Sequence, residues 1–96
     1  MLHLIFQSPL DSAVLERIAV GDEVIFLENA VLRLLKNSVF SAALTQQLTK
    51  NRLFVLADDL LVRGLNATDL VAGIEVISYA QWVDLTIKNT VIQSWT

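Results

Sequence analysis

The sequence contains no cysteine, one histidine, one proline and three glycines. Without cysteine, the side chains of this chain cannot form disulfides, thiolate metal sites or covalent bonds to a transferred sulfur atom. The lone His3 has no second histidine with which to build a metal site or a catalytic relay. The turn Gln7-Ser8-Pro9-Leu10 lacks the glycines of a phosphate-binding loop, so nucleotide binding of that kind is not expected.

Long hydrophobic runs and concentrated positive charge are also missing. Apolar stretches such as Val24 to Leu27 and Leu53 to Ala57 are far shorter than the roughly 20 residues that a membrane-spanning helix requires. Residues 1–6 show neither the basic region nor the cleavage site of a signal peptide. The net charge is −3 and the basic side chains are scattered, which argues against direct nucleic-acid binding. We therefore expect a cytoplasmic protein that contacts neither a membrane nor nucleic acid directly.

What the sequence has in excess is apolar residues, which make up 54% of the chain. Soluble domains typically contain about 45–50%. A chain of 96 residues has room for one domain, which we expect to span residues 1–96. A domain of this size leaves a large share of its surface exposed. The apolar surplus therefore predicts an interface with other protein subunits.

Short apolar runs alternate with helix-like segments, and this alternation predicts the fold class. Strands that are apolar on both faces are typical of a parallel sheet covered by helices. We expect an α/β fold with a small parallel four-stranded sheet and helices on both faces. The expected strands are Leu2 to Phe6, Glu23 to Leu27, Leu53 to Leu56 and Ile74 to Ile77. The expected helical segments are Ser12 to Ile18, Ala30 to Leu35, Ser41 to Leu48, Thr68 to Val71 and a last helix that begins after Ser78.

The last helix has the clearest start signal. Ser78 followed three residues later by Gln81 is a capping box, in which each side chain bonds the other residue's backbone N–H group. Asp84 and Lys88 are spaced to form an ion pair along the helix. We expect the apolar positions to share one face: Tyr79, Trp82, Val83 and Ile87.

The stretch Ala57-Asp58-Asp59-Leu60-Leu61-Val62-Arg63-Gly64 follows the third expected strand and contains two adjacent carboxylates and an arginine. Carboxylates favour the positive end of a helix, and glycine often ends a helix in a left-handed conformation. We interpret the stretch as one short helix. Asp58 is its expected cap, Asp59 lies in the first turn, Arg63 in the last turn, and Gly64 ends it.

Two alternatives use carboxylates for binding or chemistry. The carboxyl ends of parallel strands meet at one edge, where an open sheet has a crevice, and Ser8, Glu28, Asp58 and Ser78 are expected there. The first alternative is a small-molecule-binding module that uses this crevice. The second is a hydrolase or a magnesium site built from Glu28, Asp58 and Asp59. No nucleophile with a base and an orienting third group is visible, so we expect no catalytic residue, metal ligand or cofactor.

Trp95 stands one residue from the end of the sequence. A terminal indole would cost little to leave disordered, so its presence suggests a docking role. It is expected either to dock on the core of this subunit or to enter a groove of a partner subunit.

Several segments together resemble one family. They are "MLHLIFQSP", "GDEVIFLENAV", "LFVLADDLLVRGL" and "IEVISYAQWVDLTIKNTVIQSW", which cover nearly the whole chain. In order and spacing they are similar to the TusB/DsrH family of DsrE-like proteins. The most specific parts of the likeness are Asp59, Leu60, Arg63 and Gly64, then Ser78 and Tyr79 with Trp82, Val83 and Leu85, and finally Gln93 and Trp95.

The resemblance implies a subunit of a sulfur-relay complex in which homologous DsrE-like chains form a dimer of trimers. The implied partners are TusC- and TusD-like subunits, and indirectly TusA- and TusE-like sulfur carriers. The implied product is 2-thiolated wobble uridine in tRNA. A persulfide relay needs a thiolate at every covalent station, and this chain has none. It is therefore expected to be a non-catalytic subunit in which Asp59, Arg63, Trp82 and Trp95 have interface or structural roles.

The sequence departs from the family pattern after the second expected strand. Family members often have Glu-Asp-Gly-Val there, whereas this chain has Glu28-Asn29-Ala30-Val31. Losing the glycine removes easy access to a positive φ angle at that turn. Some DsrH-type relatives carry a cysteine in the first helical segment, and its absence around Val14 places the chain with the TusB-type branch.

Overall fold

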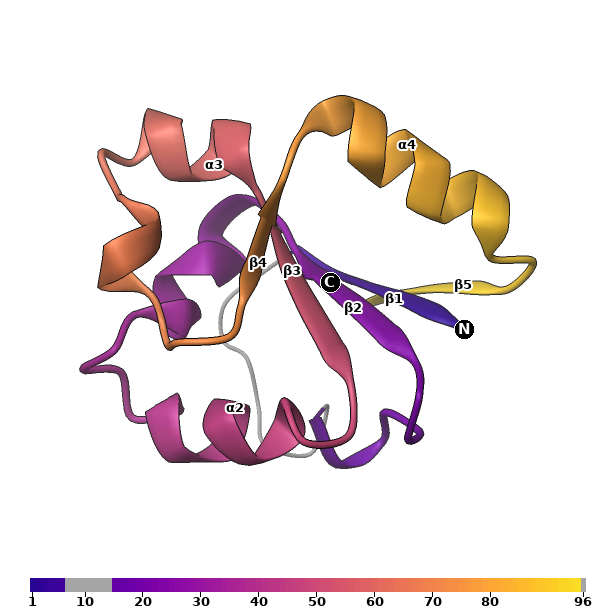
Figure 1. Cartoon of the computed structure of the whole chain (residues 1–96), viewed down its shortest axis with the longest axis horizontal. Coiled ribbons are helices and arrows are strands. Elements are labelled where there is room, and N and C mark those ends of the chain that lie inside the picture. The colour runs from indigo at the N-terminus through magenta and orange to yellow at the C-terminus, as the bar shows by residue number, and fades with distance from the viewer. Residues whose placement is uncertain (7–14, 96) are drawn as a thin grey trace.

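The computed structural model describes residues 1–6 and 15–95. Its elements form a sheet with helical segments on both sides (Figure 1). The strands are β1 (Leu2–Ile5), β2 (Glu23–Phe26), β3 (Arg52–Leu56), β4 (Glu75–Ile77) and β5 (Ile92–Trp95). The α-helices are α2 (Ser41–Gln47), α3 (Ala57–Val62) and α4 (Tyr79–Lys88), and the 3-10 helices are η1 (Glu28–Leu34) and η2 (Ala67–Asp69).

The sheet is wholly parallel, with the strand order β4-β3-β2-β1-β5. This confirms the α/β fold class, with five strands instead of the expected four. The four expected strands are β1 to β4. β1, β2 and β4 are each one residue shorter than predicted, and β3 begins one residue earlier, at Arg52. The additional strand, β5, lies beside β1 in the register Leu2↔Ile92 to Ile5↔Trp95.

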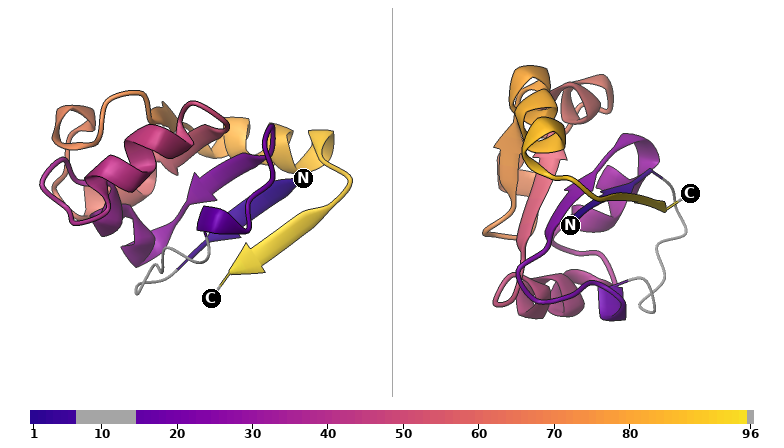
Figure 2. Two further views of the ribbon diagram at one scale, coloured as in Figure 1. Left: turned by 90° about the horizontal axis from the view of Figure 1, so that it is seen from below. Right: turned by 90° about the vertical axis from the view of Figure 1, so that its right-hand side faces the viewer.

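Apolar side chains fill both faces of the sheet. On one face, strand residues such as Val24, Phe26 and Val55 pack with η1, α2 and α3. On the other face, strand residues such as Leu4 and Ile25 pack beneath α4. Figure 2 shows the sheet between α4 and α2 in its right-hand view. All four residues of β1 and of β2 are buried, as expected for parallel strands covered on both sides.

The helical segments lie where the sequence predicted helix, but two of them are 3-10 helices. The expected helix from Ala30 is η1, a 3-10 helix that begins at Glu28. The segments at α2 and η2 lie where helix was expected, although η2 ends at Asp69. Of the expected helix from Ser12 to Ile18, residues 12–14 lie outside the described residues; Leu15 and Glu16 are helical, and Arg17 and Ile18 are not.

α4 keeps its predicted start, because Ser78 and Gln81 form both bonds of the capping box. Only one of the four residues on the expected apolar face packs against the core. Trp82 packs against the core, whereas Tyr79, Val83 and Ile87 are 59%, 38% and 77% exposed. None of the ten residues of α4 is buried, so this helix covers its face of the sheet only in part.

Within residues 1–6 and 15–95, no helix is both long enough and apolar enough to cross a membrane.

Candidate functional site

The candidate site lies at the edge of the sheet where the parallel strands end. β3 runs directly into α3, so Asp58 and Asp59 follow the strand within the first turn of the helix. β2 ends at Phe26, and η1 begins two residues later at Glu28. β2 and β3 are neighbours in the sheet, which brings these two strand ends together.

Asp59 ties the two strand ends to each other. Its Oδ2 atom accepts a hydrogen bond from the backbone N–H group of Glu28 at 2.9 Å. Glu28 has a φ angle of +52°, the one positive φ among the described residues other than glycine. A side chain in this conformation is strained. The bond from Asp59 therefore holds the turn after β2 in an unfavourable backbone conformation.

Arg63 extends this contact to the next residue of the turn. Its Nε and Nη2 atoms donate to Asn29 Oδ1 at 3.3 and 3.0 Å. Its Nη1 atom donates to the backbone carbonyl of Asp59 at 3.0 Å and lies 3.5 Å from Asp59 Oδ1. The Asp59 and Arg63 side chains are 19% and 20% exposed. We call Glu28, Asn29, Asp59 and Arg63 the clamp.

Gly64 ends α3 as the sequence predicted, whereas Arg63, expected in the last turn, is the C-cap residue after Val62. Gly64 has a φ angle of +68°, and its N–H group donates to the carbonyl of Leu61 at 3.1 Å. The N–H group of Leu65 donates to the carbonyl of Leu60 at 2.9 Å. This pair of bonds is a Schellman motif, which ends the helix and leaves Arg63 beside Asn29.

The predicted cap at Asp58 was wrong. α3 begins at Ala57, the residue before it is Leu56, and no side chain caps the helix. Asp58 is exposed and lies in the first turn, where its charge still favours the positive helix end. The cap failed because β3 continues into α3 with no residue between them.

The residues of the clamp and their hydrogen bonds indicate a structural role. It contains no nucleophile, and Asp59 and Arg63 direct their polar groups to each other and to the turn after β2. Asp59 contacts the backbone of Glu28 and not its carboxylate. Within the described part of the chain, no group of three His, Cys, Asp or Glu side chains could hold a metal ion. Ser8 lies outside the described residues, and Ser78 caps α4.

The altered turn after β2 does not need glycine at residue 30. Ala30 is fully buried within η1, and its φ angle is not positive. The positive φ falls instead on Glu28. The missing glycine therefore does not fall on the residue with the positive φ angle, which stands two positions earlier.

Trp82 lies on the side of α4 that faces the sheet. It packs against the cluster that contains Leu2, Ile25 and Phe54. The ring of Tyr79 meets it edge to face, with the centroids 5.4 Å apart. The Nε1 atom of Trp82 is buried without a hydrogen-bond partner among the described residues. A buried N–H group of this kind costs stability, so the position is tolerated for its packing and not for a polar contact.

Trp95 docks on this subunit's own core, one of its two expected positions. It packs against the cluster that contains Ile5 and Phe26. Its indole Nε1 atom donates to His3 Nδ1 at 3.1 Å. An indole can only donate, so the proton of neutral His3 resides on Nε2, which donates to Asp22 Oδ2 at 2.9 Å. The 3%-exposed His3 thus joins the last strand to the loop before β2.

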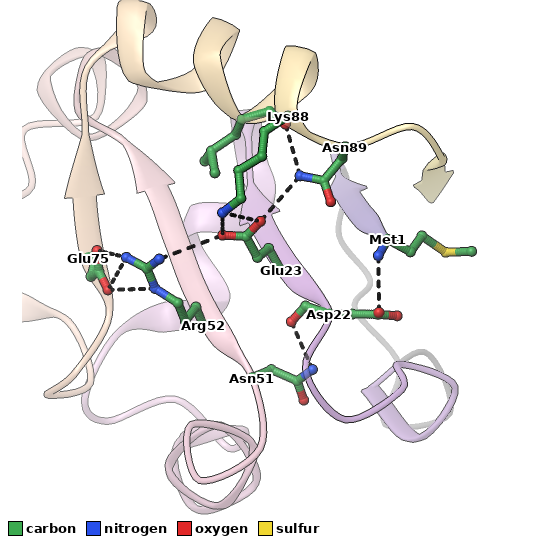
Figure 3. Close-up of polar contacts among 9 residues, drawn as sticks. Met1, Asp22, Glu23, Asn51, Arg52, Glu75, Lys88 and Asn89 are labelled. Carbon is green, nitrogen blue, oxygen red and sulfur yellow. Dashed lines mark hydrogen bonds and ion pairs between the residues drawn. The ribbon is translucent and has the colours of Figure 1, made fainter.

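At the other end of the strands, where β2, β3 and β4 begin, charged side chains form a network that the sequence did not predict (Figure 3). Glu23, whose side chain is 10% exposed, receives Lys88 Nζ at 3.4 Å and Asn89 Nδ2 at 3.2 Å. Arg52 lies 3.7 Å from Glu23 and binds both carboxylate oxygens of Glu75 at 3.1 Å. The predicted Asp84–Lys88 pair is wrong, because Lys88 turns toward the partly buried Glu23 instead.

Asp22, the residue before β2, makes the stability of the fold depend on pH. Burial alone would raise the pKa of Asp22, but the hydrogen bonds from His3 and from the amino-terminal ammonium group outweigh it and lower the pKa below 3.8. A lowered pKa in the folded state stabilises the fold above the unfolded pKa, and that stabilisation is lost as the pH falls through the folded pKa. Asp22→Asn should therefore lower Tm at neutral pH.

The Tm difference between Asp22→Asn and the unaltered chain should shrink toward zero as the pH falls below the lowered pKa of Asp22. Thermal melts of both proteins across the acid range measure it. Asp84→Asn, on exposed α4, is the matched control and should change Tm little at any pH. A Tm difference for Asp22→Asn that persists unchanged in acid would contradict the assignment.

Fold and site together define a small parallel α/β protein in which the clamp holds the turn after β2 in place. The comparisons with known proteins agree with this class. A protein of unknown function from Methanobacterium thermoautotrophicum, MTH1491, has the same fold, with a TM-score of 0.81 at 16% identity over 98% of this chain and 96% of that one.

The sequence matches more specific relatives. The family described as DsrH like protein matches residues 6–92. Protein TusB of Buchnera aphidicola is 30% identical, and Protein TusB of Yersinia enterocolitica is 34% identical, each over 99% of this chain and 100% of the relative. Protein TusB of Erwinia tasmaniensis is 33% identical over the same shares. The chain belongs to the DsrH-like family, which confirms the resemblance to TusB/DsrH proteins.

Proposed function

We propose that this chain is a non-catalytic subunit of a TusBCD-like sulfur-relay complex that supports 2-thiolation of the wobble uridine in tRNA. Membership of the DsrH-like family and the likeness to TusB proteins support a role in the tRNA sulfur-relay pathway. Its proposed partners are TusC- and TusD-like subunits in the cytoplasm. TusA- and TusE-like carriers would exchange sulfur with those partners.

The absence of cysteine is the observation that carries the non-catalytic role. Each covalent station of a persulfide relay requires a thiolate that attacks the incoming sulfur and holds it until the next transfer. This chain has no thiol at any of its 96 positions. Its contribution is therefore to complete the assembly and to position a subunit that does carry the thiol.

The candidate residues contribute to this role through structure. Asp59 and Arg63 fix the turn after β2, Trp82 packs α4 onto the sheet, and Trp95 anchors β5 to His3. The small-molecule and hydrolase alternatives draw no support from these contacts. The polar groups of the clamp are used within the clamp, and the carboxylates of Glu28 and Asp59 are not paired with each other.

Co-expression with TusC- and TusD-like chains followed by native mass measurement tests the proposal. We expect all three chains in one assembly. Omitting this chain should remove that assembly and reduce sulfur transfer from a TusA-like donor to a TusE-like acceptor. If the chain stays monomeric, and assembly and transfer by the other two chains are the same without it, the proposal is wrong.

A further inference from the structure

The two edges of the sheet differ in their protection against further strand pairing. β4 at one edge has three residues, and its Glu75 accepts three hydrogen bonds from Arg52 of the neighbouring strand. β5 at the other edge contains neither a charged residue nor a proline. Short length, charge and proline are the usual devices that prevent edge strands from pairing with another chain. β5 has neither charge nor proline to prevent such pairing, and it forms one lateral edge of the described sheet.

The backbone of β5 has hydrogen-bonding groups directed away from the sheet. The carbonyls of Val91 and Trp95 accept from the N–H groups of Leu2 and Phe6 on the β1 side, at 3.0 and 3.2 Å. Successive residues of a strand turn their backbone groups to opposite sides. The groups of Ile92 and Ser94 therefore point outward. Among them, the Ser94 carbonyl receives the exposed side chain of Gln93 at 3.2 Å, a bond that a second strand could replace.

Apolar side chains lie beside this open edge. Ile92 is 43% exposed and is paired in register with Leu2, so it lies on the face of the sheet that α4 covers. Val91, the residue before the strand, is 52% exposed. Edge residues of this kind would be covered if another strand were added beside β5.

α4 turns a second apolar surface toward the same edge. One flank of α4, with Gln81, Asp84 and Lys88, lines a shallow cavity against β3 and β4. The 100° step between helical residues places the exposed Tyr79, Val83 and Ile87 on the opposite flank. Because the strand order places β1 and β5 on the side away from β4, this flank overhangs the β5 side of the sheet. Figure 2 shows β5 as the outermost strand, with α4 behind the sheet in its left-hand view.

We infer that β5 and the overhanging flank of α4 form the docking surface for an extended strand of a partner subunit, which adds to the sheet beside β5. The inference rests on the proposed function, because it assigns the surface by which the subunit joins its complex. The outward backbone groups of Ile92 and Ser94 recognise an extended chain. The apolar residues beside them fit apolar side chains that alternate along the incoming strand.

The charge distribution selects an uncharged strand as the occupant. β5 and the residues Tyr79, Val83 and Ile87 contain no ionisable cation or carboxylate. The charged side chains of Glu23, Arg52, Glu75 and Lys88 lie at the same end of the sheet as Ile92, but they are paired with one another. An acidic or basic segment would lose its hydration at the β5 surface without gaining a counter-charge. A neutral, apolar edge strand from another DsrE-like chain satisfies both the backbone groups and the apolar flank.

Ile92→Lys in the co-expressed complex tests the inference. A lysine at an edge strand opposes pairing with a second strand, so we expect the affinity for the partner subunits to fall by about tenfold or more. Val76→Lys is the matched control, because Val76 is 39% exposed on the opposite edge strand. This control should assemble like the unaltered chain. Native mass spectrometry over a dilution series measures both variants.

Hydrogen exchange of the unaltered complex provides a readout that does not depend on a variant. The amides of Ile92 and Ser94 should exchange rapidly in the isolated chain and become protected in the complex. The amide of Gln93, which faces β1, should be protected in both. Thermal melts of the isolated Ile92→Lys chain, expected to match the unaltered chain, confirm that any loss of assembly comes from the surface.

The outcomes separate this inference from the proposed function. If the unaltered chain forms no complex, the proposed function fails and the docking surface fails with it. If the unaltered chain assembles but Ile92→Lys assembles equally well and Ile92 and Ser94 gain no protection, only the docking surface is overturned. Equal loss of assembly by Ile92→Lys and Val76→Lys would also overturn it.

Discussion

Asp59→Ala is expected to lower the free energy of unfolding by about 2 kcal/mol, because it removes a charged hydrogen-bond acceptor and an ion-pair partner at once. The lost bonds are the 2.9 Å bond from the Glu28 N–H group and the 3.5 Å contact with Arg63. The turn at Glu28 would keep its unfavourable φ angle without the bond that holds it. For a domain of this size the change corresponds to a fall in Tm on the order of 10 °C.

Asp58→Ala is the matched control for this prediction. Asp58 lies in the same helical turn with the same charge, but it is exposed and makes no cap. Its removal should change the free energy of unfolding by less than about 0.5 kcal/mol. Urea denaturation of both variants measures the difference. Equal destabilisation by the two substitutions would show that helix-end charge, and not the clamp, accounts for the effect.

Much of the fold follows from local sequence pattern. The four expected strands are short apolar runs, and their alternation with helical segments indicated a parallel sheet. β5 was missed because Ile92, Gln93, Ser94 and Trp95 form no apolar run, and most of the strand is exposed. Its position depends on backbone bonds to β1 and on the contact between Trp95 and His3, which are 92 residues apart. No local pattern encodes that contact.

The two ends of α3 could be predicted from the sequence, but the contacts that join α3 to the turn after β2 could not. The sequence indicated Asp59 at the start of a short helix and Gly64 at its end, as the structure shows. It did not indicate that Asp59 reaches the backbone of Glu28, because that bond depends on how β2 and β3 lie side by side. Lys88 illustrates the same limit, since the buried Glu23 offers a better partner than the local Asp84.

Loss of this chain from its organism is expected to bring the 2-thiouridine content of wobble-position tRNA close to zero. The chain cannot accept sulfur itself, because it has no thiol. Under the proposed function, the effect comes from the partner subunits, which would no longer hold their thiol in a productive assembly. The effect should be large, because sulfur transfer requires the thiolate and the donor in direct contact. A small displacement of either group lowers the rate of transfer strongly.

Mass spectrometry of nucleosides from digested tRNA tests the central claim most directly, with strains that have or lack this chain and a strain in which it is restored. The account predicts that 2-thiouridine disappears without the chain and returns with it, while the TusC- and TusD-like subunits are still present. An unchanged 2-thiouridine content in the strain that lacks the chain would contradict the account.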